Sequence, residues 1–393
     1  MRIAINTRLL IADRLDGIGW FTAETVRRMI HQHPEHEFYL FFDRKPDLPH
    51  GWKPLPANAH PIKLNPPARH PILWYIFFEW SVRNALKRYH IDLFLSTDGW
   101  MTLHTNTPTL DVIHDLNFEH DTHNLRPVYQ AYMKYFFPRF ARNAARIATV
   151  SEFSKQDIAA TYNLPLEKID VVYDGAHEYY RPCAIEEQQE TKEKYTQGNP
   201  YFLFVGSIIP RKNLRNLFLA FDRFKINDTT NAKLLVVGAK VDWNGDLENT
   251  YNQLGHASDV IFLGRVEAAE LAKLMGSALA LAYPSFFEGF GIPILEAFCT
   301  DTPVITSNIT SMPEVAGDAA LLINPYSVEE LASALYQIAN DADLRDSLIK
   351  KGRLQRQKFS WDHTSQLLWE SLMQIDIPTA QTHSADKKDP RNA

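Results

Sequence analysis

The chain has 393 residues, of which 45% are hydrophobic and 22% charged. This composition is that of a soluble globular protein and excludes a mainly disordered chain. Lysine and arginine total 41 and aspartate and glutamate total 47, so the formal net charge is −6. The overall charge gives no basic footprint, and we expect no nucleic-acid partner. The length predicts two or three domains.

The cysteines and the N-terminal residues indicate the cellular compartment in which the protein is expected. The two cysteines, Cys183 and Cys299, are far apart in sequence and form neither a disulfide framework nor a thiolate zinc site. The first residues, MRIAINTRLLIADRLDG, lack the apolar core of a signal peptide. The most apolar stretch, residues 72–80, is much shorter than the ~20 residues of a membrane-spanning helix. We therefore expect a cytoplasmic protein, with the inner face of a membrane as a further possibility.

The first half of the chain, residues 1–180, alternates predicted strands with predicted helices. Residues 37–42 form a continuous apolar run, which is typical of a strand buried on both faces. A loop with residues 16–19 follows the first strand, and Ser154 is the expected N-cap of the last helix. The expected strands are 2–7, 37–42, 91–97, 109–114, 146–151 and 168–173. The expected helices are 20–30, 72–89, 127–143 and 154–162.

The same alternation restarts after a polar segment. Residues 181–200 are predicted to be a linker with at most a short helical piece. The second domain is expected over 201–360, a C-terminal helix crossing back to the first domain over 361–376, and a disordered tail over 377–393. The expected strands are 201–206, 233–238, 259–264, 279–284, 303–307 and 320–323. The expected helices are 214–224, 268–275, 291–299 and 327–339, followed by three more helical stretches.

This alternation predicts an α/β fold in which parallel sheets are built from βαβ units. Two such sheets joined by a linker make two Rossmann-like domains that face each other across a cleft. Ligands of these sheets bind beyond the carboxyl ends of the strands. Chemistry is therefore expected in the loops that lead from a strand to a helix.

One such loop, within residues 284–296, combines glycines with two acids. Gly289 and Gly291 allow the backbone to approach a ligand closely, and amides at the start of the next helix can bind phosphate. The carboxylates of Glu288 and Glu296 can accept hydrogen bonds from sugar hydroxyls. The alternative is an ordinary glycine-rich turn with a solvated glutamate at each end.

Two further strand ends carry candidate residues. Arg211 and Lys212 lie together before a helix, have no acidic neighbour in the sequence, and can neutralise a diphosphate. His114 ends a strand of the first domain, where it can donate a hydrogen bond or act as an acid or base. The alternatives are an exposed basic pair and a structural histidine.

These three segments, placed in two tandem Rossmann-like domains, resemble the GT-B glycosyltransferases, and glycosyltransferase family 4 most closely. The segment from Glu288 to Glu296 matches the family's Glu-x₇-Glu signature, including the internal Gly-Phe-Gly and the proline. The resemblance covers about residues 1–375. Its supporting stretches are 16–19, 150–154, 206–213 and 312–316.

The resemblance implies donor-binding roles for the glycine-rich loop. Glu288 is expected to bind hydroxyls of the donor sugar and is counted with the catalytic residues. The amides of Gly289, Phe290 and Gly291 are expected to hold the sugar and the diphosphate. Glu296 is expected to hold the hydroxyls of the nucleotide ribose.

The resemblance also implies roles for the other two segments. Arg211 and Lys212 are expected to clamp the leaving diphosphate. Ser207 stands where many members have arginine, so the positive charge must come from that pair. The first-domain residues expected near the donor or acceptor are His114, counted as catalytic, and the loop glycines Gly17 and Gly19.

The implied activity is retaining transfer of a hexose, mannose or glucose first, from a nucleotide-sugar to an acceptor hydroxyl. GDP-mannose or UDP-glucose is the expected donor, a glycan or lipid-linked molecule the expected acceptor, and no metal or cofactor is expected. The alternatives are a sugar phosphorylase or epimerase of similar fold and a catalytically silent scaffold that binds sugar nucleotides.

Three other features suggest ligands less specifically. Asp341-Ala-Asp343 resembles a metal-binding Asp-x-Asp but is expected to lie in a helix cap. The histidine groups at 31, 33 and 36 and at 120 and 123 lack a fixed cysteine or carboxylate partner. The aromatic stretch within 72–88 is either a core helix or, with its cations, an acceptor platform or a peripheral membrane contact.

Overall fold

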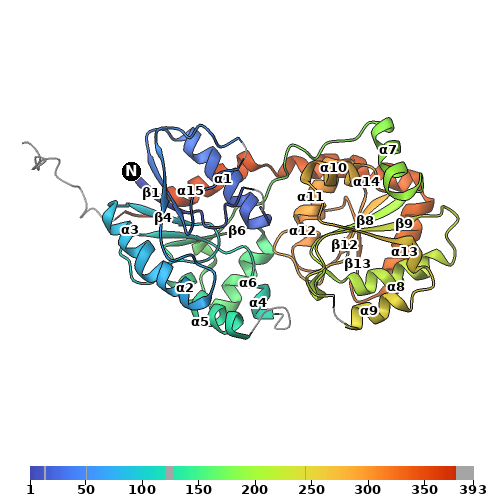
Figure 1. Cartoon of the computed structure of the whole chain (residues 1–393), viewed down its shortest axis with the longest axis horizontal. Helices are drawn as coiled ribbons and strands as arrows, with labels where there is room; N and C mark the ends of the chain where they lie inside the picture. The colour runs from blue at the N-terminus through green and yellow to red at the C-terminus, as the bar shows by residue number, and fades with distance from the viewer. Residues whose placement is uncertain (13–14, 50, 121–126, 244, 378–393) are drawn as a thin grey trace, which may run out of the picture.

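The computed structural model describes residues 1–12, 15–49, 51–120, 127–243 and 245–377. His123 and the tail from residue 378 lie outside the described residues. The chain forms two sheets, each in its own half of the molecule, and helices cover the faces of both (Figure 1). The prediction of two Rossmann-like parallel sheets is confirmed.

The first sheet has seven strands in the order β3-β2-β1-β4-β5-β6-β7, and all its pairings are parallel. The predicted strands are all present, but β3 was not predicted. β3 lies at the edge of the sheet, contains a proline and buries only Ala59 fully, so it lacks the apolar run of a central strand. The strands are β1 (Arg2–Asn6), β2 (Glu37–Phe42), β3 (Ala59–Lys63), β4 (Leu93–Ser96), β5 (Thr109–Val112), β6 (Arg146–Thr149) and β7 (Ile169–Val171).

The second sheet has six parallel strands in the order β10-β9-β8-β11-β12-β13. Its central strand β8 is buried throughout, as expected for a parallel strand covered on both faces. The strands are β8 (Tyr201–Val205), β9 (Lys233–Val237), β10 (Val260–Gly264), β11 (Ala280–Tyr283), β12 (Val304–Ser307) and β13 (Leu321–Ile323).

Two helices of the first domain begin earlier than predicted because of their caps. α1 (Gly17–Gln32) begins directly after Asp16, whose side chain accepts a hydrogen bond from the Gly19 amide at 2.9 Å. Gly17 and Gly19 therefore lie in the first turn of a helix and not in a loop. α6 (Glu152–Tyr162) is capped by Ser151 and not by Ser154, because the Ser151 hydroxyl accepts from the Ser154 amide at 3.0 Å.

The first domain has further helical segments. Residues 71–88 form one continuous helical stretch with a π-helical turn in its middle. The segments are α2 (Pro71–Ile76), η1 (Phe77–Val82) with α3 (Arg83–Arg88), α4 (Asn117–His120) and α5 (Pro127–Asn143).

The segment predicted as a linker is mostly helix. α7 (Ile185–Thr196) packs on α10 (Ala268–Gly276), where Lys194 Nζ lies 2.7 Å from Glu270 Oε1. α7 is polar and buries few of its residues, so its sequence carried little of the periodicity that marks a helix. The other helices of this half are α8 (Leu214–Lys225), α9 (Gly245–Asn252), α11 (Ile292–Cys299), α12 (Met312–Ala316), α13 (Val328–Asn340) and α14 (Ala342–Gln355).

The last helix, α15 (Trp361–Met373), returns from the second domain and lies beside α1 (Figure 1). Asp362 Oδ1 lies 2.6 Å from Arg28 Nε, and the Trp369 ring stacks on His33 at 3.7 Å between centroids. The Ser365 hydroxyl donates to the Thr25 carbonyl at 3.1 Å. The end of the chain thus ties the two domains together.

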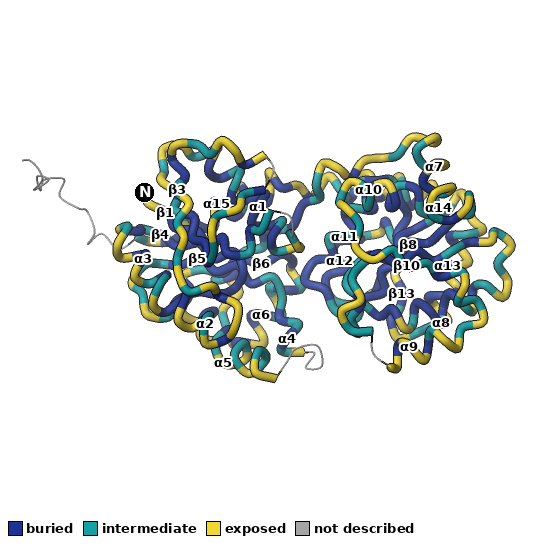
Figure 2. Tube along the Cα trace, in the orientation of Figure 1, coloured by how far each residue is buried: buried dark blue, intermediate teal, exposed yellow. Residues whose placement is uncertain are grey.

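Figure 2 shows that the strands of both sheets are buried and that exposed residues lie on the outer helices and loops. Among the described residues, one hydrophobic cluster packs within each domain, and a further cluster is shared by both. No helix among the described residues is long and apolar enough to cross a membrane.

Candidate active site between the two domains

The loops predicted to carry chemistry meet between the two sheets. A Cβ atom at Gly289, in the loop after β11, would lie 2.6 Å from the His114 carbonyl oxygen, in the loop after β5. A Cβ atom at Gly17 would lie 3.6 Å from Ile292 Cδ1. Glycine is required at position 289 because any side chain there would collide with the first domain. The structure therefore brings residues of both domains to one place.

Arg211, Lys212 and Glu288 form a buried charged cluster. Glu288 Oε2 lies 2.8 Å from Arg211 Nη1, and Glu288 Oε1 lies 2.7 Å from Lys212 Nζ. The three side chains are 15%, 12% and 9% exposed. Burial opposes ionisation of Glu288, but the charges of Lys212 and Arg211 lower its pKa to about 2. The basic pair thus has an acidic neighbour that is distant in the sequence. The cluster has a net charge of +1.

The local backbone explains how the cluster forms. Arg211 and Lys212 lie in a 3₁₀ turn, η3 (Pro210–Lys212), which ends at Asn213 in the left-handed conformation. The Asn213 amide group donates to the carbonyls of Pro284 and Pro325 at 2.9 and 2.8 Å. The turn after β8 is thereby fixed to the loop after β11, and its two cations face Glu288.

The cluster retains donors for an anion. Arg211 Nε is buried and has no hydrogen-bond partner among the described residues. Burial lowers the pKa of Lys212 against the pull of Glu288, while Lys212 Nζ donates to the Tyr283 hydroxyl at 2.6 Å. Ser207 follows the end of β8 and is half-buried. A buried donor without a partner is costly, and a diphosphate oxygen would satisfy it.

The glycine-rich loop ends at the start of α11. Gly291 has φ of 103°, which favours glycine, and no side chain of a described residue caps the helix. The Ser311 hydroxyl donates to the carbonyls of Glu288 and Phe290, both at 2.9 Å, and holds the loop in place. The amides of residues 289–291 are thus fixed at a helix N-terminus, where the helix dipole favours an anion.

Glu296 lies within α11 and is half-buried. Burial raises its pKa to about 7, although the Tyr180 hydroxyl hydrogen-bonds to it and opposes the shift. Its charged form is therefore the one that a ligand with hydroxyl donors would stabilise. The raised pKa of Glu296 is consistent with the expected binding of ribose hydroxyls.

Binding of a nucleoside diphosphate is expected to depend on pH through Glu296. If ribose hydroxyls donate to the carboxylate, binding lowers its pKa, releases a proton near pH 7, and weakens about tenfold as the pH falls from ~8 to ~6. Calorimetry in buffers of different ionisation enthalpy measures the released proton. Glu296→Gln is the control for the phosphate's own titration. Equal pH dependence in the variant and the original protein would contradict the assignment.

The backbone of His114 meets the glycine-rich loop from the first domain. Its Nε2 lies 2.9 Å from the Thr97 carbonyl oxygen, which only accepts, so Nε2 carries the proton. Burial lowers the pKa of His114, and its ring packs edge-on against Phe21 at 4.9 Å. His114 is therefore neutral at pH 7, and Nδ1 is its remaining acceptor.

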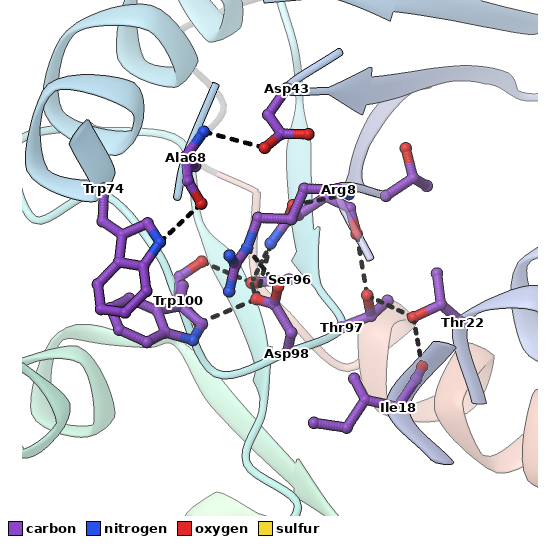
Figure 3. A network of polar contacts seen from close by, with 12 residues as sticks. Arg8, Ile18, Thr22, Asp43, Ala68, Trp74, Ser96, Thr97, Asp98 and Trp100 are labelled. Atoms are coloured by element: carbon purple, nitrogen blue, oxygen red, sulfur yellow. Dashed lines mark hydrogen bonds and ion pairs between the residues drawn. The ribbon is translucent and has the colours of Figure 1, made fainter. Parts of the chain in front are cut away.

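A polar network around Thr97 and Asp98 joins the strand ends of the first domain (Figure 3). Arg8 Nε donates to Asp98 Oδ2 at 2.6 Å, and the Asn6 amide group donates to Asp98 Oδ1 at 2.8 Å. The Thr97 hydroxyl donates to the Asn6 carbonyl at 2.9 Å and accepts from Thr22 of α1 at 2.8 Å. The network joins β1, β4 and α1. It therefore fixes the position of the Thr97 carbonyl, which accepts the hydrogen bond from His114 Nε2.

Three polar residues at the interface were not predicted as site residues. The hydroxyls of Ser151 and Ser154 donate to the Gly289 carbonyl at 2.6 and 3.2 Å. Glu314 of α12 accepts from the amides of Glu152 and Phe153 at 2.8 and 3.1 Å, and so caps α6 from the other domain. They lie in two supporting stretches, 150–154 and 312–316, and Ser151 follows a strand. The place of Ser151 after a strand was the feature of the sequence that could have identified it as a site residue.

Residues of the candidate metal motifs form hydrogen bonds or ion pairs with other side chains and amides. Asp341 caps α14, its Oδ1 accepting from the Leu344 amide at 2.8 Å. His120 Nε2 lies 2.8 Å from Asp157 Oδ1, a carboxylate partner that the sequence did not show. Among the described residues, no three histidine, cysteine or acidic side chains are grouped so that they could hold a metal ion.

Two family models match the chain. Residues 185–355 match the model described as glycosyl transferases group 1. This region contains the charged cluster and Glu296. Residues 15–177 match the model described as glycosyltransferase family 4, which contains His114. The two matched regions meet at the interface between the domains.

Named proteins resemble the chain in sequence and in fold. O-antigen chain mannosyltransferase B of Escherichia coli is 34% identical over 225 residues, which are 56% of this chain and 58% of that protein. O-antigen chain mannosyltransferase RfbU of Salmonella typhimurium is 30% identical over 275 residues, 68% of this chain and 71% of that one. The crystal structure of Anabaena HepE in complex with UDP and glucose has a TM-score of 0.73 over 94% of this chain and 99% of that chain. At 16% identity, this last likeness concerns the fold alone.

Proposed function

Since the chain belongs to the group 1 glycosyltransferases, with a first domain of family 4, we propose that it transfers a hexose from a nucleotide-sugar to an acceptor hydroxyl. The observation that carries the proposal is the buried cluster of Arg211, Lys212 and Glu288 beside the start of α11, with the backbone carbonyl of His114 meeting Gly289 of the same loop from the other domain. The cluster and the amides of residues 289–291 bind the diphosphate, and Glu288 and His114 face the sugar.

Mannose is the first candidate sugar, because the two relatives from Escherichia coli and Salmonella typhimurium are named mannosyltransferases. GDP-mannose is then the donor, and UDP-glucose is the second candidate because the structure of similar fold holds UDP and glucose. Those relatives are named for the O-antigen chain, which favours a growing glycan, free or lipid-linked, as the acceptor.

The proposed reaction exchanges one bond at the anomeric carbon. The bond to the diphosphate oxygen breaks, the acceptor oxygen forms a bond on the same face, and the acceptor proton passes to the leaving phosphate. The protein contributes positioning and stabilises the charge that develops on the diphosphate. Arg211 Nε is the buried donor that this charge would engage.

A thermal-shift panel of GDP-, UDP-, dTDP- and ADP-sugars tests the donor, because a ligand of the native state raises the unfolding temperature. The proposal expects GDP-mannose to give the largest shift. Slow hydrolysis of the same nucleotide-sugar by the purified protein distinguishes an enzyme from a silent scaffold. A shift without hydrolysis or transfer would favour the scaffold.

Turnover is expected to survive chelation. Cationic side chains and helix amides surround the proposed diphosphate position and take the place of a divalent ion. Activity measured with and without EDTA checks this. A complete loss on chelation that manganese or magnesium restores would mean that the phosphate site is misassigned.

A further inference from the structure

We propose that the outer face of the first domain binds the surface of an anionic lipid bilayer. This aromatic face consists of residues 69–88 and 127–143. Four apolar side chains of α2 and η1 lie there on one side of the helical stretch and are exposed to solvent. They are Ile72, Tyr75, Ile76 and Trp80, at 65%, 41%, 37% and 65% exposure; Tyr75 and Ile76 lie three and four residues after Ile72, and Trp80 lies four residues after Ile76.

The patch continues onto α5. The rings of Tyr75 and Phe136 lie 6.0 Å apart, and α5 adds exposed Val128 and Tyr135, at 51% and 54%. Figure 2 shows exposed residues along α2 and α5 on this side of the domain. Two neighbouring helices thus present tryptophan, tyrosine and isoleucine outward, which are the side chains favoured at a membrane interface.

The charges on the aromatic face select anionic lipid over a protein partner. Its two segments hold a single carboxylate, Glu79, which is 5% exposed, points inward and accepts from the Leu103 amide at 2.8 Å. Only Lys134, 3.9 Å from Glu119, forms an ion pair with a described carboxylate. The cations of the face are Arg69, Arg83, Lys87, Arg88, Lys134, Arg139 and Arg142. Although the net charge of the protein is −6, most cations of this face pair with no described carboxylate and lie in the same segments as the exposed aromatics, which is the chemistry that suits an anionic bilayer surface.

Aromatic rings connect this face to the site. The Trp74 ring lies 5.6 Å from Tyr132 and 4.4 Å from Trp100, whose backbone amide donates to Asp98 in the network around Thr97 (Figure 3). If the proposed function holds, docking on this face places the first-domain side of the site close to the bilayer, where a lipid-linked acceptor would be held.

Vesicle co-sedimentation without any sugar nucleotide tests the docking separately from the activity. The protein is expected to bind vesicles of phosphatidylcholine mixed with phosphatidylglycerol more strongly than vesicles of phosphatidylcholine alone, and raising NaCl from ~0.1 M to ~0.5 M should weaken binding. Ile72→Ser with Trp80→Ser should lower the partition coefficient at least about tenfold. The control pair, Ile226→Ser with Leu354→Ser, is equally exposed on the second domain and should leave binding unchanged.

A second pair of variants tests the charge. Lys87→Gln with Arg88→Gln should lower binding to the anionic vesicles about tenfold or more at low salt, whereas Lys350→Gln with Lys351→Gln should not. Failure of the original protein to bind, or equal losses in face and control variants, would overturn the proposal. A dimer in sedimentation velocity that Ile72→Ser with Trp80→Ser dissolves, without lipid binding, would assign the face to a second copy instead.

Discussion

Replacing Arg211 and Lys212 with alanine is expected to have two separate effects. Nucleoside diphosphate binding should weaken by about 2–4 kcal/mol, because two charge-assisted contacts are lost. The free energy of unfolding should also fall, by roughly 3–5 kcal/mol, because Glu288 is buried and would lose both of its cations. Calorimetry and chemical denaturation measure the two effects.

A third substitution separates these effects. Adding Glu288→Gln to the double variant removes the unpaired charge, so the triple variant should regain stability while diphosphate binding stays weak. Unchanged diphosphate affinity in the folded triple variant would refute the clamp. Recovery of both stability and binding would mean that the two cations only hold Glu288 in place.

The sequence predicted the fold well where hydrophobic pattern alone decides the structure. Buried central strands such as β2 and β8 are continuous apolar runs, and they were found at nearly their observed limits. Edge strand β3 and polar helix α7 were missed or underestimated, because each buries too few side chains to leave a pattern. Their positions depend on neighbours that are distant in the sequence.

The candidate site was predictable residue by residue but not as a set of contacts. The strand-end rule located His114, Arg211 and Glu288 in three different loops. No spacing revealed that Glu288 would neutralise one charge of the basic pair, since that contact joins positions 76 and 77 residues apart. Nor could it show that Glu314 would cap α6 across the interface. Such contacts follow from how the two domains pack.

Glu288→Gln is expected to lower kcat/KM by roughly 10²-fold or more, about 2.7 kcal/mol of transition-state stabilisation. The amide keeps the shape of the side chain but loses the charge that accepts sugar hydroxyl bonds. Affinity for the bare nucleoside diphosphate should be maintained or increased, because the negative charge beside Arg211 and Lys212 disappears. Steady-state kinetics and diphosphate titration check the two expectations. Loss of diphosphate binding would mean that Glu288 supports the loop and does not serve the sugar.

His114→Ala is expected to lower kcat/KM by a similar factor, roughly 10²-fold or more, with diphosphate affinity unchanged. Two conservative variants identify the working atom. His114→Asn places a polar atom near the Nδ1 position, whereas His114→Gln can reach the Thr97 carbonyl that Nε2 now contacts. If the free Nδ1 faces the sugar, asparagine should restore part of the turnover and glutamine should not. Higher turnover with glutamine than with asparagine would show that His114 acts by holding the strand end. Near-normal turnover in His114→Ala would mean that His114 takes no part in the reaction.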